Sequence, residues 1–166
     1  MKRKTAFVWL AAGVLLVAGT VVFVRDARER ARRARCLSPL HCCFRKAMVM
    51  YSMDHGGAFP SNMLALADCG ANSPKLFKCP GSDTVPGAMA NVDEWMDYIY
   101  IYWKDGDKTP TNYPWIYERR LSHHRGEGIH VAPIAGPAFW DEGAQWLQNF
   151  AKEHPELKIR MPDDLK

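Results

Sequence analysis

The sequence lacks the short motifs that mark familiar enzymes. It contains no Walker loop, no G-x-S-x-G elbow and no H-E-x-x-H zinc motif. It also lacks a C-x2-C pair, the order of Ser, His and Asp typical of a catalytic triad, and any internal repeat. These absences leave no residues to carry a reaction or to bind an organic cofactor, and we predict a protein that is not an enzyme.

Charge is absent from residues 5–24, "TAFVWLAAGVLLVAGTVVFV". A helix of about 20 apolar residues is long enough to cross the hydrocarbon layer of a membrane. A cleavable signal peptide is the alternative, because basic residues precede the run and Val17-Ala18-Gly19 resembles a cleavage site. The apolar region of a signal peptide usually spans only about 7–15 residues, however. We therefore expect a retained transmembrane helix that contacts membrane lipid.

Most of the chain carries no excess of positive charge. The formal net charge is +4, but nine of the 22 lysines and arginines lie at 2–4 and 25–35, on either side of the apolar run. Residues 36–166 hold 13 basic and 16 acidic side chains, a net charge of −3. Basic residues at the ends of a span typically contact lipid phosphates, whereas nucleic-acid binding needs a basic folded face. We predict no nucleic-acid partner.

Residues 36–55 have the pattern of an amphipathic helix. Apolar residues recur every three or four positions, which places them on one side of a helix that needs a partner surface. The helix-packing candidates are Leu37, Leu40, Phe44, Met48 and Tyr51. Ser38-Pro39 predicts a kink or a restart of the helix. Gly56-Gly57 predicts its end, and Pro60 delays a second, short helix until Ser61.

Four stretches rich in β-branched and aromatic residues predict strands of a small antiparallel sheet. They are residues 98–103, 113–118, 128–134 and 137–140. Asp141 then predicts the N-cap of a helix that runs to residue 154.

The predicted fold class is therefore α+β. A long N-terminal membrane-spanning helix packs on a short helix and a small antiparallel sheet, with a helix near the C-terminus. The expected ranges are 1–35 for the transmembrane helix with its arginine-rich extension, 36–154 for the α+β domain and 155–166 for a flexible tail.

Four stretches resemble the type II secretion pseudopilin G-like proteins, which are type IV pilin-like. They are "RARCLSPL", "MYSMDHGGAFP", "SPKLFKCPGSD" and "HHRGEGIHVAPIAGPAFW", and the resemblance covers residues 36–150. The chain differs from the family at two places. Its N-terminus lacks the glycine and the Phe-Thr-Leu-x-Glu signature of prepilins, and Ala135 and Pro137 stand near the places of the family's aspartate and histidine.

The resemblance implies a bacterial pilin-like domain outside the cytoplasm, on a helix anchored in the inner (cytoplasmic) membrane. It implies a structural component of a type II secretion or type IV pilus-like system, which acts through homo- or hetero-oligomeric contacts with other pseudopilins or secretion components. Gly56-Gly57 and Phe59-Pro60 would then form an architectural corner. The missing N-terminal signature favours the alternative, a membrane-tethered periplasmic binding or sensor domain that does not polymerise.

Five cysteines in such a compartment favour disulfides, although an odd number leaves one over. The candidates are Cys36, Cys42, Cys43, Cys69 and Cys79. Counted from Pro60, Cys36 lies 24 residues before the corner and Cys79 lies 19 after it. Because a helix rises only about 1.5 Å per residue and a loop covers more, we expect Cys36 to pair with Cys79. Cys42 or Cys43 then pairs with Cys69, and a local Cys69–Cys79 bridge is the alternative.

Three other groupings of polar residues are weaker candidates for a functional site. A zinc site from His41, Cys42, Cys43 and Cys69 would make a periplasmic thiol or metal enzyme, but adjacent cysteines on a helix point about 100° apart, and we predict no metal site there. The histidines, His55, His123, His124 and His130, are typical of surface hydrogen-bonding residues unless they converge. Asp105-Gly106-Asp107, like Asp83, is typical of a turn, with calcium as the one ion that it suits.

Overall fold

The computed structural model describes the backbone of residues 2–165, and the side chains of that range except those at 2–8, 10–12 and 41. Contacts divide the chain into two units that meet between Arg32 and Arg33. The first unit consists of most of helix α1 (Lys2–Ser38). The second unit begins three residues earlier than the expected boundary after residue 35, and it contains the end of α1 and all later elements.

Helix α1 carries the segment that was predicted to span a membrane. Within the described residues, no helix is both long enough and apolar enough to do so. The predicted membrane-spanning fold class, transmembrane helix and single-pass inner-membrane location were therefore wrong. The side chains at 5–8 and 10–12 of the predicted span lie outside the described residues.

The chain remains helical from α1 into α2 (Arg45–Asp54) in spite of Pro39. A π-helical stretch, η1 (Pro39–Phe44), replaces the expected kink or restart. Proline has no N–H to donate, so the regular hydrogen-bond ladder is interrupted here and a wider turn bridges the gap. The apolar side of this helix lies in the core: Leu40, Phe44, Ala47 and Met48 are buried, and Leu37 and Tyr51 pack beside them.

The double glycine ends α2 as the sequence indicates. Gly56 and Gly57 have φ values of 62° and 90°, which only glycine adopts without strain, and Gly57 N–H donates to Ser52 O at 2.8 Å. The short helix expected from Ser61 shrinks to a single 3₁₀ turn, η2 (Leu64–Leu66).

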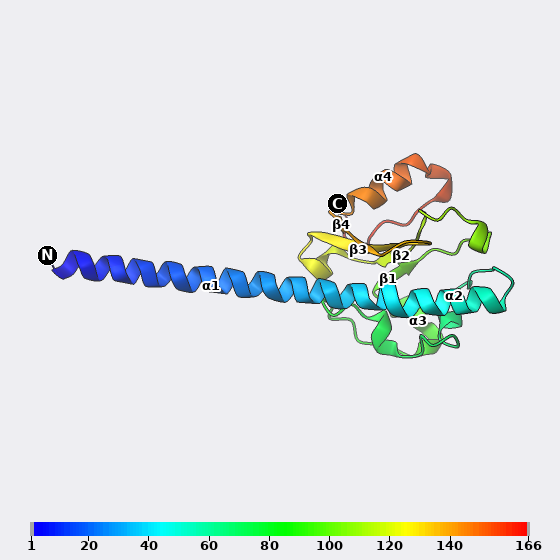
Figure 1. The fold of residues 1–166 in the computed structure, drawn as a ribbon, viewed down its shortest axis with the longest axis horizontal. Coiled ribbons are helices and arrows are strands. Elements are labelled where there is room, and N and C mark those ends of the chain that lie inside the picture. Colours follow the sequence, from blue (N-terminus) through cyan, green and yellow to red (C-terminus); the bar gives the residue numbers. More distant parts are fainter. Residues whose placement is uncertain (1, 166) are drawn as a thin grey trace. The chain divides into compact units, whose positions relative to one another are not determined.

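The second unit contains a four-stranded antiparallel sheet in the order β1-β2-β3-β4 (Figure 1). The strands are β1 (Tyr98–Tyr100), β2 (Pro114–Glu118), β3 (Gly128–Pro133) and β4 (Phe139–Glu142). The short helix α3 (Val92–Trp95) and the 3₁₀ turns η3 (Pro74–Phe77), η4 (Met89–Asn91), η5 (Gly106–Lys108), η6 (Leu121–His124) and η7 (Pro155–Leu157) lie in the connections.

The sheet separates two apolar cores. Tyr98 and Trp115 join the core that Phe44 and Phe77 form on the helical side, whereas Tyr117 and Ile129 face α4 (Gln145–Glu153) on the other side (Figure 1). Successive side chains of a strand point to opposite faces, and β1, β2 and β3 each supply residues to both cores. The Phe44 and Phe77 rings lie 5.0 Å apart between centroids.

The C-terminal part of the chain is fixed by two aspartates. Asp141 belongs to β4 and α4 begins only at Gln145, but the Asp141 carboxylate accepts the N–H groups of Trp146 and Leu147 at 2.9 and 3.0 Å. The tail expected to be flexible packs on the domain instead. Asp164 accepts the N–H groups of Leu121 and Ser122 at 2.7 and 2.8 Å, and Ile159 contacts the core.

The buried side of α2 and η1 makes a direct prediction about stability. Replacing the fully buried Phe44 by alanine leaves a cavity and lowers the free energy of unfolding by about 3–5 kcal/mol. Met53→Ala, on the same helix at 79% exposure, changes it by less than about 0.5 kcal/mol. Urea unfolding followed by circular dichroism measures both. Equal effects of the two substitutions would contradict the packing described.

Candidate functional site

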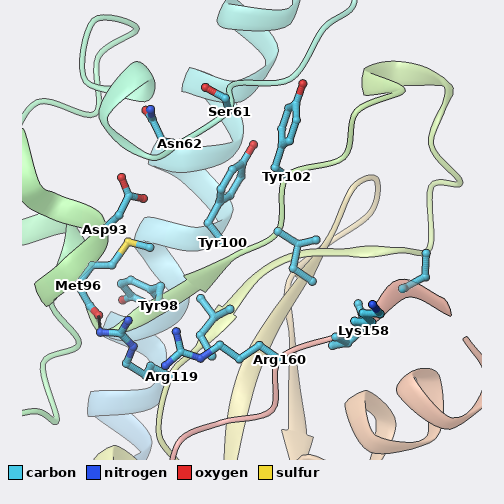
Figure 2. Close-up of a pocket in the computed structure, with 14 residues that line it drawn as sticks. Ser61, Asn62, Asp93, Met96, Tyr98, Tyr100, Tyr102, Arg119, Lys158 and Arg160 are labelled. Atoms are coloured by element: carbon cyan, nitrogen blue, oxygen red, sulfur yellow. Dashed lines mark hydrogen bonds between the residues drawn. The ribbon is translucent and has the colours of Figure 1, made fainter. Parts of the chain in front are cut away.

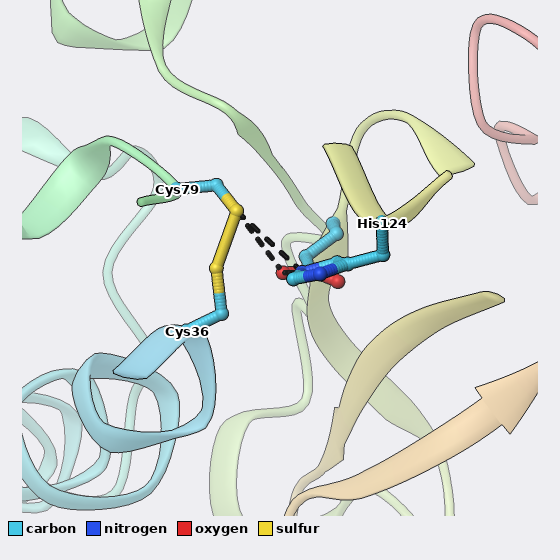
Figure 3. A group of neighbouring side chains, drawn as sticks. Cys36, Cys79 and His124 are labelled. Atoms are coloured by element: carbon cyan, nitrogen blue, oxygen red, sulfur yellow. Dashed lines mark hydrogen bonds and ion pairs between the residues drawn. A yellow bond between two sulfur atoms is a disulfide. The ribbon is translucent and has the colours of Figure 1, made fainter. Parts of the chain in front are cut away.

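Four fully buried side chains from separate parts of the chain converge on one point, and Figure 3 labels three of them. They are Cys36 near the end of α1, Cys79 after η3, Glu118 at the end of β2 and His124 in η6. Cys36 and Cys79 form a disulfide with Cα atoms 5.5 Å apart. The ligand atoms of the four residues all lie within 4.8 Å of one another. We call these four residues the buried cluster.

The turn between β2 and β3 brings the histidines to Glu118. Arg125 and Gly126 have positive φ values of 61° and 77°, so the chain reverses directly after His124. Strand β3 then returns beside β2, and its His130 lies opposite the Glu118 carboxylate. This placement depends on strand pairing between residues that are distant in the sequence.

Glu118 holds a carboxylate with no exposure to solvent. His124 Nε2 lies 3.0 Å from Oε1, and His130 donates its backbone N–H to Oε2 at 2.7 Å while its Nδ1 lies 3.3 Å from the same oxygen. Burial alone would raise the pKa of Glu118, but hydrogen bonds from His124 and His130 outweigh it and lower the pKa to about 2. The carboxylate is therefore ionised at neutral pH.

The disulfide touches this carboxylate directly. Cys79 Sγ lies 3.6 Å from Glu118 Oε1 and 3.6 Å from His124 Nε2 (Figure 3). A disulfide sulfur carries no hydrogen, so neither it nor the carboxylate oxygen can donate a hydrogen bond to the other. The His124 ring is the group between them that can donate a proton.

Further residues hold the cluster in place. Trp140 packs edge-on against His124 and His130, with ring centroids 5.4 and 5.0 Å away, and the Arg33 guanidinium lies 4.1 Å above the Trp140 ring. On the other side the buried Asp97 accepts the N–H of Cys79 at 2.8 Å. These contacts fix both the sheet side and the loop side of the buried cluster.

The cysteines differ from the expected arrangement in one respect. The outer pair, Cys36 with Cys79, is joined, which also excludes the alternative Cys69–Cys79 bridge. The inner pair does not form: Cys42, Cys43 and Cys69 are free, and Cys42 is exposed. The side chain of His41 lies outside the described residues, and the described cysteines of the alternative zinc site do not form a metal-capable group.

The histidines were expected at the surface, and three of them are buried. His123, His124 and His130 are 7%, 0% and 3% exposed, whereas His55 is exposed and stacks on Tyr51. His123 lies beside the cluster, with Nε2 3.7 Å from Asp97 Oδ1, and burial lowers its pKa. Sequence reasoning missed Glu118. The available signal was its place two residues after the apolar Ile116, which puts it on an inward-facing position of the strand.

The acidic turn at 105–107 forms η5 and packs against the end of α2, with Asp107 N–H donating to Gly57 O at 2.9 Å. Among the described residues, it does not gather a third acidic or histidine ligand. Calcium binding stays a prediction.

A cleft of about 540 Å³ opens elsewhere on the domain, with Tyr100, Tyr102, Arg119 and Arg160 among its lining residues (Figure 2). Its two arginines already have partners. Arg119 donates to Met96 O at 3.0 Å, and Arg160 pairs with Asp163 at 2.6 Å. The buried cluster, in which four fully buried ligand atoms lie within 4.8 Å of one another, is the stronger candidate site.

Comparison of the chain with protein families, with curated proteins and with solved structures finds no match. The resemblance to pseudopilins therefore stays a prediction from four stretches of sequence.

The disulfide makes a prediction about stability. Because it closes a loop with a sequence separation of 43, replacing Cys36 and Cys79 together by alanine lowers the free energy of unfolding by about 4 kcal/mol. Cys42→Ala, at an exposed free cysteine, serves as the control and has little effect. Denaturant unfolding under non-reducing conditions measures the difference. A paired variant as stable as the control would contradict a structural role for the bond.

The lowered pKa of Glu118 predicts that the stability of the fold depends on pH. Its pKa in the folded protein, about 2, lies below the ordinary value of 4.5, so the unfolded chain binds more protons between these values. The contribution of Glu118 is complete above pH 4.5 and is lost as the pH falls to 2, by roughly 3 kcal/mol in all. Glu118→Gln removes this part of the pH profile of urea unfolding, whereas Glu142→Gln, at an exposed position, keeps it. Parallel profiles for wild type and Glu118→Gln would contradict the assignment.

Proposed function

We propose that the protein is a non-enzymatic, pseudopilin-like structural subunit whose N-terminal helix packs against the same helix of other copies. The observation that carries the proposal is the apolar surface of α1 between Gly13 and Val24, whose described side chains are all exposed. Leu15, Leu16 and Val17 are 72%, 71% and 61% exposed. An apolar surface of this extent is typical of an interaction site.

The exposed apolar residues surround the helix and do not form one stripe. Consecutive residues of an α-helix lie about 100° apart, so Leu15, Leu16 and Val17 point in three different directions. A single partner covers only one side of such a helix, and a helix that is apolar all round requires neighbours on several sides. A bundle of like helices supplies them, because each copy presents the same surface. Each fully buried leucine or valine contributes about 1.5–3 kcal/mol.

The distribution of charge favours a staggered arrangement of the copies. Residues 25–35 carry six arginines and two acidic residues, whereas residues 36–166 carry a net charge of −3. In an arrangement without stagger, the arginine-rich segments of neighbouring chains would lie side by side and repel one another. A stagger places the arginines of one copy beside the acidic domain of the next. This complementarity supports a filament-like assembly of identical subunits.

The pseudopilin resemblance supports the same function. The stretches that carry it include the double-glycine corner and the loop with Cys79, and both have architectural roles here. The disulfide ties the end of α1 to the domain, so the domain stays attached to the part of the helix that enters it.

The test compares two variants of the full-length protein. Replacing Leu15, Leu16 and Val22 by glutamine removes apolar area from several sides of the helix, and we expect it to weaken self-association by about a hundredfold or more. The control makes the same replacement at Met53 and Val85, two exposed apolar residues of the second unit, and we expect it to leave self-association unchanged. Sedimentation velocity over a range of concentrations gives the association constants, and circular dichroism checks that each variant is folded.

Three outcomes would contradict the proposal. One is a wild-type protein that stays monomeric at every concentration, as the alternative binding or sensor domain would. Another is an equal loss of association in both variants. The third is a monomer that binds lipid vesicles through the helix and does not associate with itself.

A further inference from the structure

We infer that reduction of the Cys36–Cys79 disulfide converts the buried cluster into a site for one Zn²⁺ ion, with the two cysteine sulfurs, Glu118 Oε1 and His124 Nε2 as ligands. The inference is independent of the proposed assembly. It rests on the geometry, the donor types and the surroundings of the four side chains.

The redox step requires a dithiol as the reductant. Its thiolate attacks one sulfur of the disulfide, the Cys36–Cys79 S–S bond breaks, and the reductant leaves as a cyclic disulfide. The protein gains two electrons and two protons and carries two thiols. Zinc then displaces the two thiol protons, which pass to solvent, and binds the two thiolates. His124 exchanges its proton on Nε2 for one on Nδ1, so that Nε2 is free to bind the ion and the imidazole stays neutral.

Two distances in the buried cluster match those of a zinc tetrahedron, and a third is shorter by about 0.4 Å. With bonds of about 2.3 Å to sulfur and about 2.0–2.2 Å to nitrogen or oxygen, a sulfur lies about 3.6 Å from the nitrogen and oxygen ligands, which lie about 3.4 Å from each other. Cys79 Sγ lies 3.6 Å from both Glu118 Oε1 and His124 Nε2, and these two atoms are 3.0 Å apart. Release of Cys36 Sγ from its covalent bond supplies the fourth corner.

The donor types favour zinc over other common ions. Two thiolates, one imidazole and one carboxylate form a four-coordinate set that suits Zn²⁺, whereas calcium and magnesium prefer oxygen ligands. All four side chains are fully buried, so the set is complete and leaves no open position for substrate or water. The site is therefore structural or regulatory and does not perform hydrolysis.

The groups around the cluster already orient its ligands. His130 holds Glu118 Oε2 through its backbone N–H, which leaves Oε1 directed at the sulfurs. Gly81 donates its N–H to Cys79 Sγ at 3.4 Å, a contact that stabilises a thiolate. A side chain at Gly81 is excluded, because its Cβ would lie 2.2 Å from His123 O. Outer contacts of this kind fix ligand orientation in metal sites.

Oxidised and zinc-bound forms would connect the same parts of the chain by different bonds. In the oxidised form the disulfide joins α1 to the loop after η3, and Glu118 and His124 only contact it. In the zinc form all four residues bind one ion, which links α1 and the loop to β2 and η6. The cluster thus offers a connection between helix and sheet in both reducing and oxidising surroundings.

The test uses a background in which Cys42, Cys43 and Cys69 are replaced by serine, so that Cys36 and Cys79 are the remaining cysteines. The protein is reduced with dithiothreitol, freed of reductant by anaerobic gel filtration, and titrated with Zn²⁺ alone against a chelating dye. We expect one tightly bound zinc per reduced chain and none per oxidised chain. Cobalt in place of zinc should give a thiolate charge-transfer band and the visible spectrum of a tetrahedral site.

Matched variants identify the ligands. Glu118→Gln and His124→Gln should each weaken zinc binding by about a hundredfold or more, beyond the 10–100-fold range typical of outer contacts. His123→Gln, at the neighbouring buried histidine, should leave it unchanged. If the reduced protein unfolds, recovery of its circular dichroism spectrum on addition of zinc supports the site.

The site is excluded if the reduced background protein binds no stoichiometric zinc, or if it unfolds and zinc does not restore it. Equal binding by the Glu118, His124 and His123 variants, or a cobalt spectrum without the thiolate band, would also overturn the inference. Self-association does not enter any of these measurements, so failure here and failure of the proposed assembly are distinguishable.

Discussion

The fold of the second unit depends on the Cys36–Cys79 disulfide and on the hydrogen-bonded, buried carboxylate of Glu118 beside it. The disulfide attaches the end of α1 to the loop after η3, and Glu118 connects that loop to β2, β3 and η6 through His124 and His130. An ionised carboxylate is costly to bury, so it persists only where hydrogen bonds compensate for lost water. Three such bonds make the cluster a fixed point between helix and sheet.

Local sequence signals predicted the parts of the fold that depend on neighbouring residues. The apolar spacing of Leu40, Phe44 and Met48 indicated the buried side of the helix, and Gly56-Gly57 indicated its end. Long-range packing explains the differences. The tail is ordered because Asp164 binds the backbone near Leu121, and the histidines are buried because β2 and β3 pair. Neither contact has a signal in the residues next to it.

The candidate site was only partly predictable for the same reason. Distances along the two sides of a helical hairpin were enough to place Cys36 opposite Cys79. Glu118 and His124 lie six residues apart in sequence, but only the chain reversal through η6 brings them to the same sulfur. The apolar run in α1 shows the reverse case. Its composition indicated a membrane span, but no helix within the described residues is both long and apolar enough for one, and we propose that its exposed side chains contact other copies.

The most direct test of the account is amide hydrogen exchange of the full-length protein before and after reduction, in the presence of a metal chelator. If the buried cluster is the fixed point of the domain, reduction should accelerate exchange at the amides of Cys79 and His130, which donate to Asp97 and Glu118. The amide of Leu147, which is held by Asp141 at the start of α4, should exchange as before. Unchanged exchange at Cys79 and His130 after complete reduction would contradict the central role of the disulfide and its carboxylate.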